Sequence, residues 1–146
     1  MPRRPWHLRP IAVATLVLCS LAALDFVMAL GRNATYLESL PAPLRAALAA
    51  WLDALPLWAL AARTLAVWGA LAGSVLLLAA SRHAVACFAV ALIGLAVQTA
   101  HALFLSAPPL PAALAPGTRL SALVSLLALL AIMAYARRLF QTGVLR

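Results

Sequence analysis

The sequence predicts an all-α protein that crosses a membrane four times and forms a single domain over residues 1–146. Hydrophobic residues make up 66% of the chain, and charged residues only 10%, which is too little polar surface for a soluble domain of this size. Four apolar runs are long enough to cross a bilayer core, which takes about 20 helical residues. All ten prolines lie outside these runs, so we expect unbroken helices.

The four spanning helices are expected at about residues 11–30, 57–80, 84–105 and 120–136. The first run follows Arg3, Arg4 and Arg9, as in a secretory signal. It is nevertheless long enough to span, and we expect it to be retained as the first helix. Continuous helices also argue against a transporter whose substrate lies at an interrupted helix.

The positions of the arginines predict the orientation, because short cytoplasmic loops collect Arg and Lys. With both termini cytoplasmic, seven arginines lie inside and three outside. The loops at 31–56 and 106–118 are then outside, and the turn at 81–83 is inside. The inside group is Arg3, Arg4, Arg9, Arg82, Arg137, Arg138 and Arg146, and the outside group is Arg32, Arg45 and Arg119.

The first outer loop contains a helical pattern of its own, at about residues 43–55. Its apolar side chains fall on one stripe, opposite Arg45 and Asp53. We expect a short amphipathic helix that lies in the membrane interface or caps the bundle, with a simple spacer as the alternative. The stripe consists of Leu44, Leu48, Trp51, Leu52 and Leu55.

Composition and motifs exclude several other classes of protein. The net charge of +8 comes from arginines, most of which lie where the orientation of the spans explains them. We therefore expect them to contact lipid headgroups, and we expect no nucleic-acid partner. Cys19 and Cys87 lie in apolar runs and are interpreted as buried hydrophobes. A single membrane histidine, without a cysteine at its depth, predicts no metal site, and we expect no cofactor. No catalytic motif is present at usable spacing, so an enzyme is only a third hypothesis, based on Asp25 and His101.

Three ionisable residues fall inside the expected spans, where a central charge costs roughly 2.5 to 3.5 kcal/mol. Asp25, Arg63 and His101 lie roughly 6 to 9 Å below the outer boundary at the helical rise. We therefore expect one polar pocket that opens outward, with Asp25 bonded to Arg63. The alternatives are a structural helix clamp and an arginine that reaches the headgroups alone. Gln98, Ser121 and Ser125 are expected to line the same pocket.

Two glycines four residues apart, Gly69 and Gly73, form a small-residue ridge on the second expected helix. Such a ridge lets another helix approach closely. We favour packing within the four-helix bundle, and a dimer face is the alternative.

Two segments of the chain carry a family resemblance: DFVMALGRNATYL and LPLWALAARTLAVWGALAGSVLLLAASRHAV. The chain resembles small four-helix bacterial inner-membrane proteins, some of which are labelled sugar transporters. The resemblance implies this architecture, that location and a polar cluster at the outer end of the first helix. The implied cluster is Asp25, Arg32, Asn33 and Tyr36. Where the family has an apolar residue this chain has Arg63, and the region of Gln98 and His101 has no firm family pattern.

Two functional hypotheses follow. The first is an inner-membrane protein that binds or transports a small polar solute in the outward-facing pocket, as a homodimer or larger assembly. The candidate binding residues are Asp25, Arg32, Asn33, Tyr36, Arg63, Gln98 and His101. The second is a non-catalytic accessory or scaffold subunit that packs against a larger membrane complex.

Overall fold

The computed structural model describes residues 6–105 and 115–145, and in those ranges the chain is helical apart from short turns and bends. The elements are α1 (Leu8–Leu30), α2 (Ala34–Glu38), α3 (Ala42–Asp53), α4 (Leu57–Leu78), α5 (Ala84–Ala100), the π-helical turn η1 (His101–Leu105) and α6 (Ala115–Gln141). Four helical segments are long and apolar enough to cross a membrane: α1, α4, α5 continued by η1, and α6. The predicted number of spans is confirmed.

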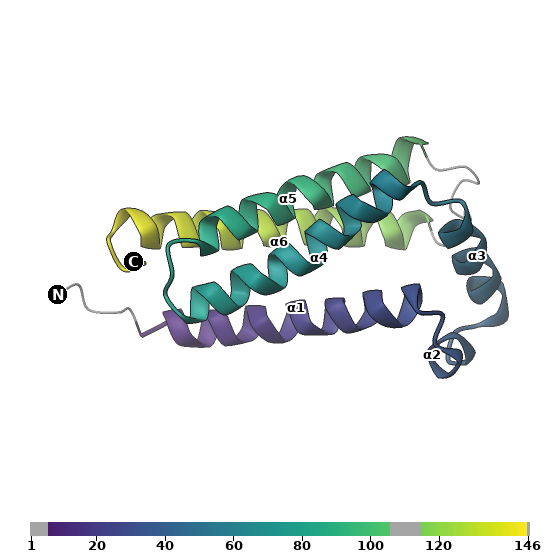
Figure 1. Ribbon diagram of the computed structural model, residues 1–146, viewed down its shortest axis with the longest axis horizontal. Helices are drawn as coiled ribbons and strands as arrows, with labels where there is room; N and C mark the ends of the chain where they lie inside the picture. Colours follow the sequence, from purple (N-terminus) through teal and green to yellow (C-terminus); the bar gives the residue numbers. More distant parts are fainter. Residues whose placement is uncertain (1–5, 106–114, 146) are drawn as a thin grey trace.

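The spanning helices pack in the order α1, α4, α5, α6 (Figure 1). The closest association is between α4 and α5, and α1 then packs against α4 and α6 against α5. The beginning of α1 and the end of α6 lie at one end of the molecule, and α2 and α3 lie at the other (Figure 1). We call the latter the α3 end. The predicted cytoplasmic side of the termini stays a prediction.

Three helices begin earlier than the sequence predicts, and each has a proline in its first turn. Pro10 is the third residue of α1, Pro43 the second of α3 and Pro116 the second of α6. Proline is tolerated there because the first amide groups of a helix have no acceptor within it. The helix α6 therefore begins five residues before residue 120, while its candidate membrane span begins at Leu120, as predicted. The rest of the predicted second outer loop, 106–114, lies outside the described residues.

A helical segment is present close to the predicted 43–55. It is α3, at Ala42–Asp53, while its expected place in the membrane interface stays a prediction. The short helix α2 was not predicted. The Asn33 side chain starts α2 by accepting a hydrogen bond from the Tyr36 backbone N–H at 3.1 Å.

Small residues allow the helices to approach closely. A Cβ on Gly94 of α5 would come within 2.5 Å of the Ala62 carbonyl oxygen of α4. Gly69 lies against Ala91 of α5, and Gly73 against the ring of Phe88. The Gly69–Gly73 ridge therefore packs inside the bundle.

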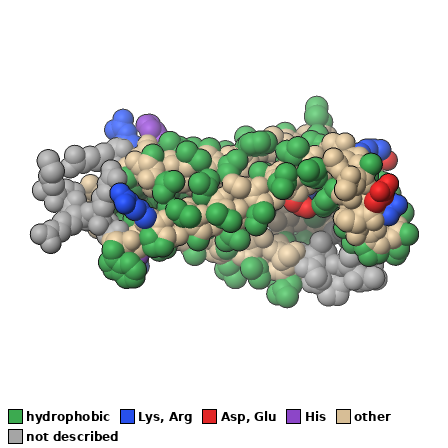
Figure 2. Space-filling view, turned by 90° about the horizontal axis from the view of Figure 1, so that it is seen from below, with side chains coloured by type: hydrophobic (Ala, Val, Ile, Leu, Met, Phe, Trp, Pro, Cys, Tyr) green, Lys and Arg blue, Asp and Glu red, His purple; other side chains and the backbone are tan. Residues whose placement is uncertain are grey.

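The surface of the spans is mostly apolar: on the visible face most charged side chains lie at the two ends, and an acidic patch lies between the middle and the α3 end (Figure 2). Many large hydrophobic side chains are exposed on α1, α4, α5 and α6. Such a continuous apolar belt fits a lipid surrounding, since a soluble protein rarely exposes so large a patch.

Candidate functional site

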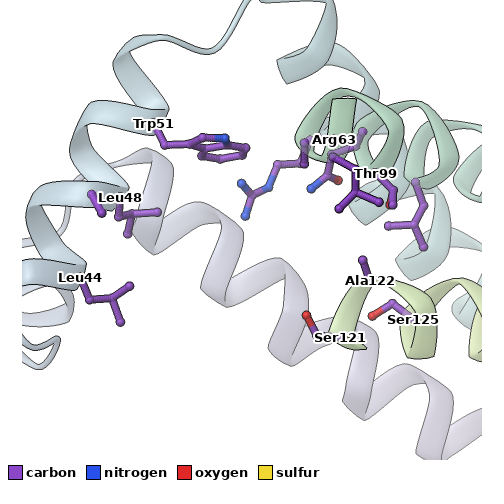
Figure 3. Close-up of a pocket in the computed structure, with 13 residues that line it drawn as sticks. Leu44, Leu48, Trp51, Arg63, Thr99, Ser121, Ala122 and Ser125 are labelled. Carbon is purple, nitrogen blue, oxygen red and sulfur yellow. The ribbon is translucent and has the colours of Figure 1, made fainter. Parts of the chain in front are cut away.

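A cavity of about 350 Å³ lies at the α3 end, between α3, α4, α5 and α6 (Figure 3). This volume is near the lower limit for small-molecule sites. The leucines of its wall make it mostly apolar. The lining residues are Leu44, Ala47, Leu48, Trp51, Arg63, Leu95, Gln98, Thr99, Ala102, Leu103, Ser121, Ala122 and Ser125.

Arg63 is the only cation among the described lining residues, and its guanidinium is held between two aromatic rings. Its Cζ lies 5.4 Å from the ring centre of Phe26 in α1 and 5.3 Å from that of Trp51 in α3. Cation–π contacts of this kind are worth about 0.5 to 2 kcal/mol each, depending on desolvation. They lower the cost of a charge within a membrane span without neutralising it.

Figure 3 shows the guanidinium of Arg63 extending below the Trp51 ring into the cavity. In the described part of the chain it forms no hydrogen bond and no ion pair. Gln98 and Thr99 from α5 and Ser125 from α6 add amide and hydroxyl groups to the lining. No Asp or Glu is among the described lining residues. The site thus combines one positive charge with uncharged hydrogen-bonding groups.

Asp25 does not form the expected ion pair with Arg63. Its Oδ1 instead accepts a hydrogen bond from the Tyr36 hydroxyl at 2.6 Å, which joins α2 to α1. This bond to Asp25, followed by desolvation and the negative charge of Asp25, raises the pKa of the Tyr36 phenol above its ordinary value of 10.0. Asp25 still acts on Arg63 through its charge, but it does not line the cavity.

Arg32 and Asn33 also lie outside the cavity lining. Arg32 forms a salt bridge with Asp53 at the end of α3, and both side chains are more than half exposed. Arg32 also has a positive φ of 49° in the turn between α1 and α2. With Tyr36, these two residues therefore set the path of the chain from α1 through α2 to α3.

His101 lies next to Trp58 rather than in the cavity. The two rings meet edge to face, with their centres 5.0 Å apart. His101 is only 5% exposed, and its Nδ1 is buried without a hydrogen-bond partner in the described structure. It begins the π-helical turn η1, in which Ala102 and Leu103 do reach the cavity. The sequence places Asp25, Arg63 and His101 at one depth, but the fold separates their side chains.

Sequence reasoning missed Thr99 as a lining residue, and it left open whether the predicted amphipathic helix lies in the membrane interface or caps the bundle. The stripe of Leu44, Leu48 and Trp51 faces the cavity, so α3 caps the bundle. Their helical spacing was the available signal, although it left open which surface the stripe would cover.

No protein-family model, curated protein or solved structure matches the chain. The family resemblance of the two sequence segments therefore stays a prediction.

Proposed function

We propose that the chain is a multi-pass protein of a bacterial inner membrane, with both termini cytoplasmic, that binds or transports a small polar solute. The observation that carries the proposal is the guanidinium of Arg63, which reaches the cavity without a carboxylate partner among the described residues. A charge in a membrane span is costly, and such residues commonly mark solute or ion sites.

The other lining groups support a solute that accepts and donates hydrogen bonds. Gln98 offers both a carbonyl and an amide group, and Thr99 and Ser125 offer hydroxyls. Because the described lining contains one cation and no acid, its charge is complementary to an oxyanion. Four helices rarely enclose a path alone, so transport requires a homodimer or a larger assembly.

Binding and uptake by reconstituted protein test this proposal. A panel of sugars, carboxylates and inorganic ions is offered to vesicles with wild type, with Arg63→Gln, or without protein. We expect at least one solute to bind wild type and to lose at least tenfold affinity in Arg63→Gln. The matched control is Arg82→Gln, which removes an exposed arginine at the opposite end of the bundle. Wild-type vesicles that behave like empty ones across the panel would contradict the proposal.

An accessory subunit of a larger membrane complex is the second candidate. The observation that favours it is the sparse burial of α6: only 11% of an 18-residue apolar stretch of this helix is buried within the described chain. A second membrane protein could cover this face. Recovery of a stoichiometric large partner in mild detergent supports the accessory function, whereas recovery of a free homo-oligomer alone contradicts it.

A further inference from the structure

Among the described residues, the cavity lacks a wall between α1 and α6. None of its described lining residues belongs to α1. Whereas α1 packs against α4 and α6 against α5, no comparable packing joins α1 to α6 in the described chain. Ser125 lines the cavity and is also exposed, and the face seen in Figure 2 is hollowed toward the α3 end.

Because α1 and α6 are both candidate membrane spans, we infer that the side between them faces hydrocarbon rather than water in a bilayer. The wall offers Leu44, Leu95 and Leu103 to an apolar group and one guanidinium to a charged group. A highly hydroxylated solute would lose its water on such a route without replacement hydrogen bonds, which is unfavourable. An amphiphile already dissolved in the bilayer avoids that cost, because its chain stays in apolar surroundings throughout.

The single guanidinium determines the charge of the group that fits. One cation balances one negative charge, whereas a dianion would remain half uncompensated in a low-dielectric site. Guanidinium binds carboxylate through two parallel hydrogen bonds, and this planar geometry is specific to Arg. Trp51 holds the guanidinium from one side, and its own Nε1 is buried without a hydrogen-bond partner among the described residues.

The volume indicates the size of ligand that fits within the cavity. At roughly 30 Å³ for a group the size of a water molecule, 350 Å³ holds about twelve such groups. That is the size of a saturated carboxylate of about ten carbons.

We propose that the cavity binds a monovalent amphiphilic carboxylate of medium chain length, which enters from the bilayer between α1 and α6 and is anchored by Arg63. The inference rests on the proposed binding function and names its ligand class. It predicts that recognition needs both parts of the ligand, the charge and the chain.

Fluorescence quenching in phosphatidylcholine nanodiscs tests this inference, with α-bromodecanoate as the probe. Its bromine is next to the carboxylate, so binding at Arg63 brings it beside Trp51, whose ring lies 5.3 Å from the guanidinium carbon. We expect saturable quenching that is lost in Trp51→Phe and retained in Trp68→Phe. Decanoate should displace the probe, and decanol and acetate should not.

Arg63 variants test the role of the charge. Arg63→Gln should weaken probe binding at least tenfold, Arg63→Lys should retain part of it, and Arg82→Gln should leave it unchanged. The lysine variant keeps the positive charge, and size-exclusion profiles show whether each variant is folded. Unchanged affinity in a folded Arg63→Gln protein overturns the inference.

Competition distinguishes this inference from the broader proposal. If acetate displaces the probe as well as decanoate does, the cavity is a site for small anions, and the proposed amphiphilic ligand is overturned. Equal displacement by decanol would show that the carboxylate is not recognised. If an added anionic phospholipid displaces the probe better than decanoate does, the site binds lipid headgroups, and the inference is overturned as well. If the probe does not bind but a solute of the panel does, the inference alone fails, and if nothing binds, both fail.

Discussion

The hydroxyl of Tyr36 donates a 2.6 Å hydrogen bond to the Asp25 carboxylate, so the acid of the first span is satisfied by a residue eleven positions later in the chain. This bond leaves Arg63 without a carboxylate partner in the described structure. The aromatic rings of Phe26 and Trp51 hold its guanidinium instead. The charge of Arg63 therefore remains available to a ligand.

The Tyr36 phenol should titrate above its ordinary value, because its hydrogen bond and the charge of Asp25 favour the neutral form. In a Tyr135→Phe background Tyr36 is the only tyrosine. The absorbance of its tyrosinate form, at about 295 nm, can be followed as the pH is raised. Adding Asp25→Asn should lower the measured pKa.

The same shift has a consequence for stability. The folded-state pKa is above the unfolded value of 10.0, so this contribution to stability is complete below pH 10 and is lost as the pH rises through the folded pKa. A Tyr36→Phe variant should not show this loss. Equal phenol pKa values with and without the Asp25 carboxylate would contradict the hydrogen bond.

Double-mutant cycles should separate the two partners that Asp25 could have. Asp25→Asn and Tyr36→Phe remove one shared hydrogen bond, so we expect a coupling energy of about 0.5 to 1.5 kcal/mol. Asp25→Asn and Arg63→Gln should show weaker coupling, since these residues share no direct contact. Unfolding in mixed micelles measures both cycles. Stronger coupling of Asp25 to Arg63 than to Tyr36 would show that the expected ion pair forms after all.

Gly94 should be intolerant of a side chain. A Cβ there would come within 2.5 Å of the Ala62 carbonyl oxygen, which is backbone and cannot move without shifting α4. We expect Gly94→Ala to lower the free energy of unfolding by about 1 to 3 kcal/mol, as other overpacking changes do. Ala86→Val, on an exposed position of the same helix, is the matched control and should have little effect. Equal stability of the two variants would show that α4 and α5 are farther apart than described.

Removing the charge of Asp25 should strengthen anion binding. Asp25 acts electrostatically on Arg63 without lining the cavity, so it opposes an anion there. Asp25→Asn should raise the affinity of α-bromodecanoate several-fold, and the effect should shrink at high salt to the extent that Asp25 is exposed. Weaker binding in a folded Asp25→Asn protein would mean that Asp25 helps to hold the ligand.

The sequence predicts the spanning helices well because length and hydropathy determine them within a bilayer. It predicts the cavity in part: Arg63, Gln98, Ser121 and Ser125 do line one cavity. The helical rise predicts the depth of a residue but not the direction of its side chain. Asp25 and His101 therefore have neighbours other than the expected ones.

The remaining features depend on local geometry that hydropathy does not reveal. The five-residue helix α2 is started by the side chain of Asn33, and it brings Tyr36 back to Asp25. The direction in which the apolar stripe of α3 faces depends on the same connection from α1 through α2. No apolar periodicity marks so short a helix, so the hydrogen bond from Tyr36 to Asp25 was not predicted, although the family resemblance implied that both residues belong to one polar cluster.

Photolabelling tests the central claim, a ligand site at Arg63, most directly. A medium-chain carboxylate with a diazirine near its carboxyl group is photolysed with the reconstituted protein, and the labelled peptides are mapped by mass spectrometry. The account predicts labels on the cavity walls of α3 and α5, near Trp51 and Gln98, that decanoate suppresses and Arg63→Gln removes. Labels spread over the exposed faces of α1 and α6, at the same level in Arg63→Gln, would contradict it.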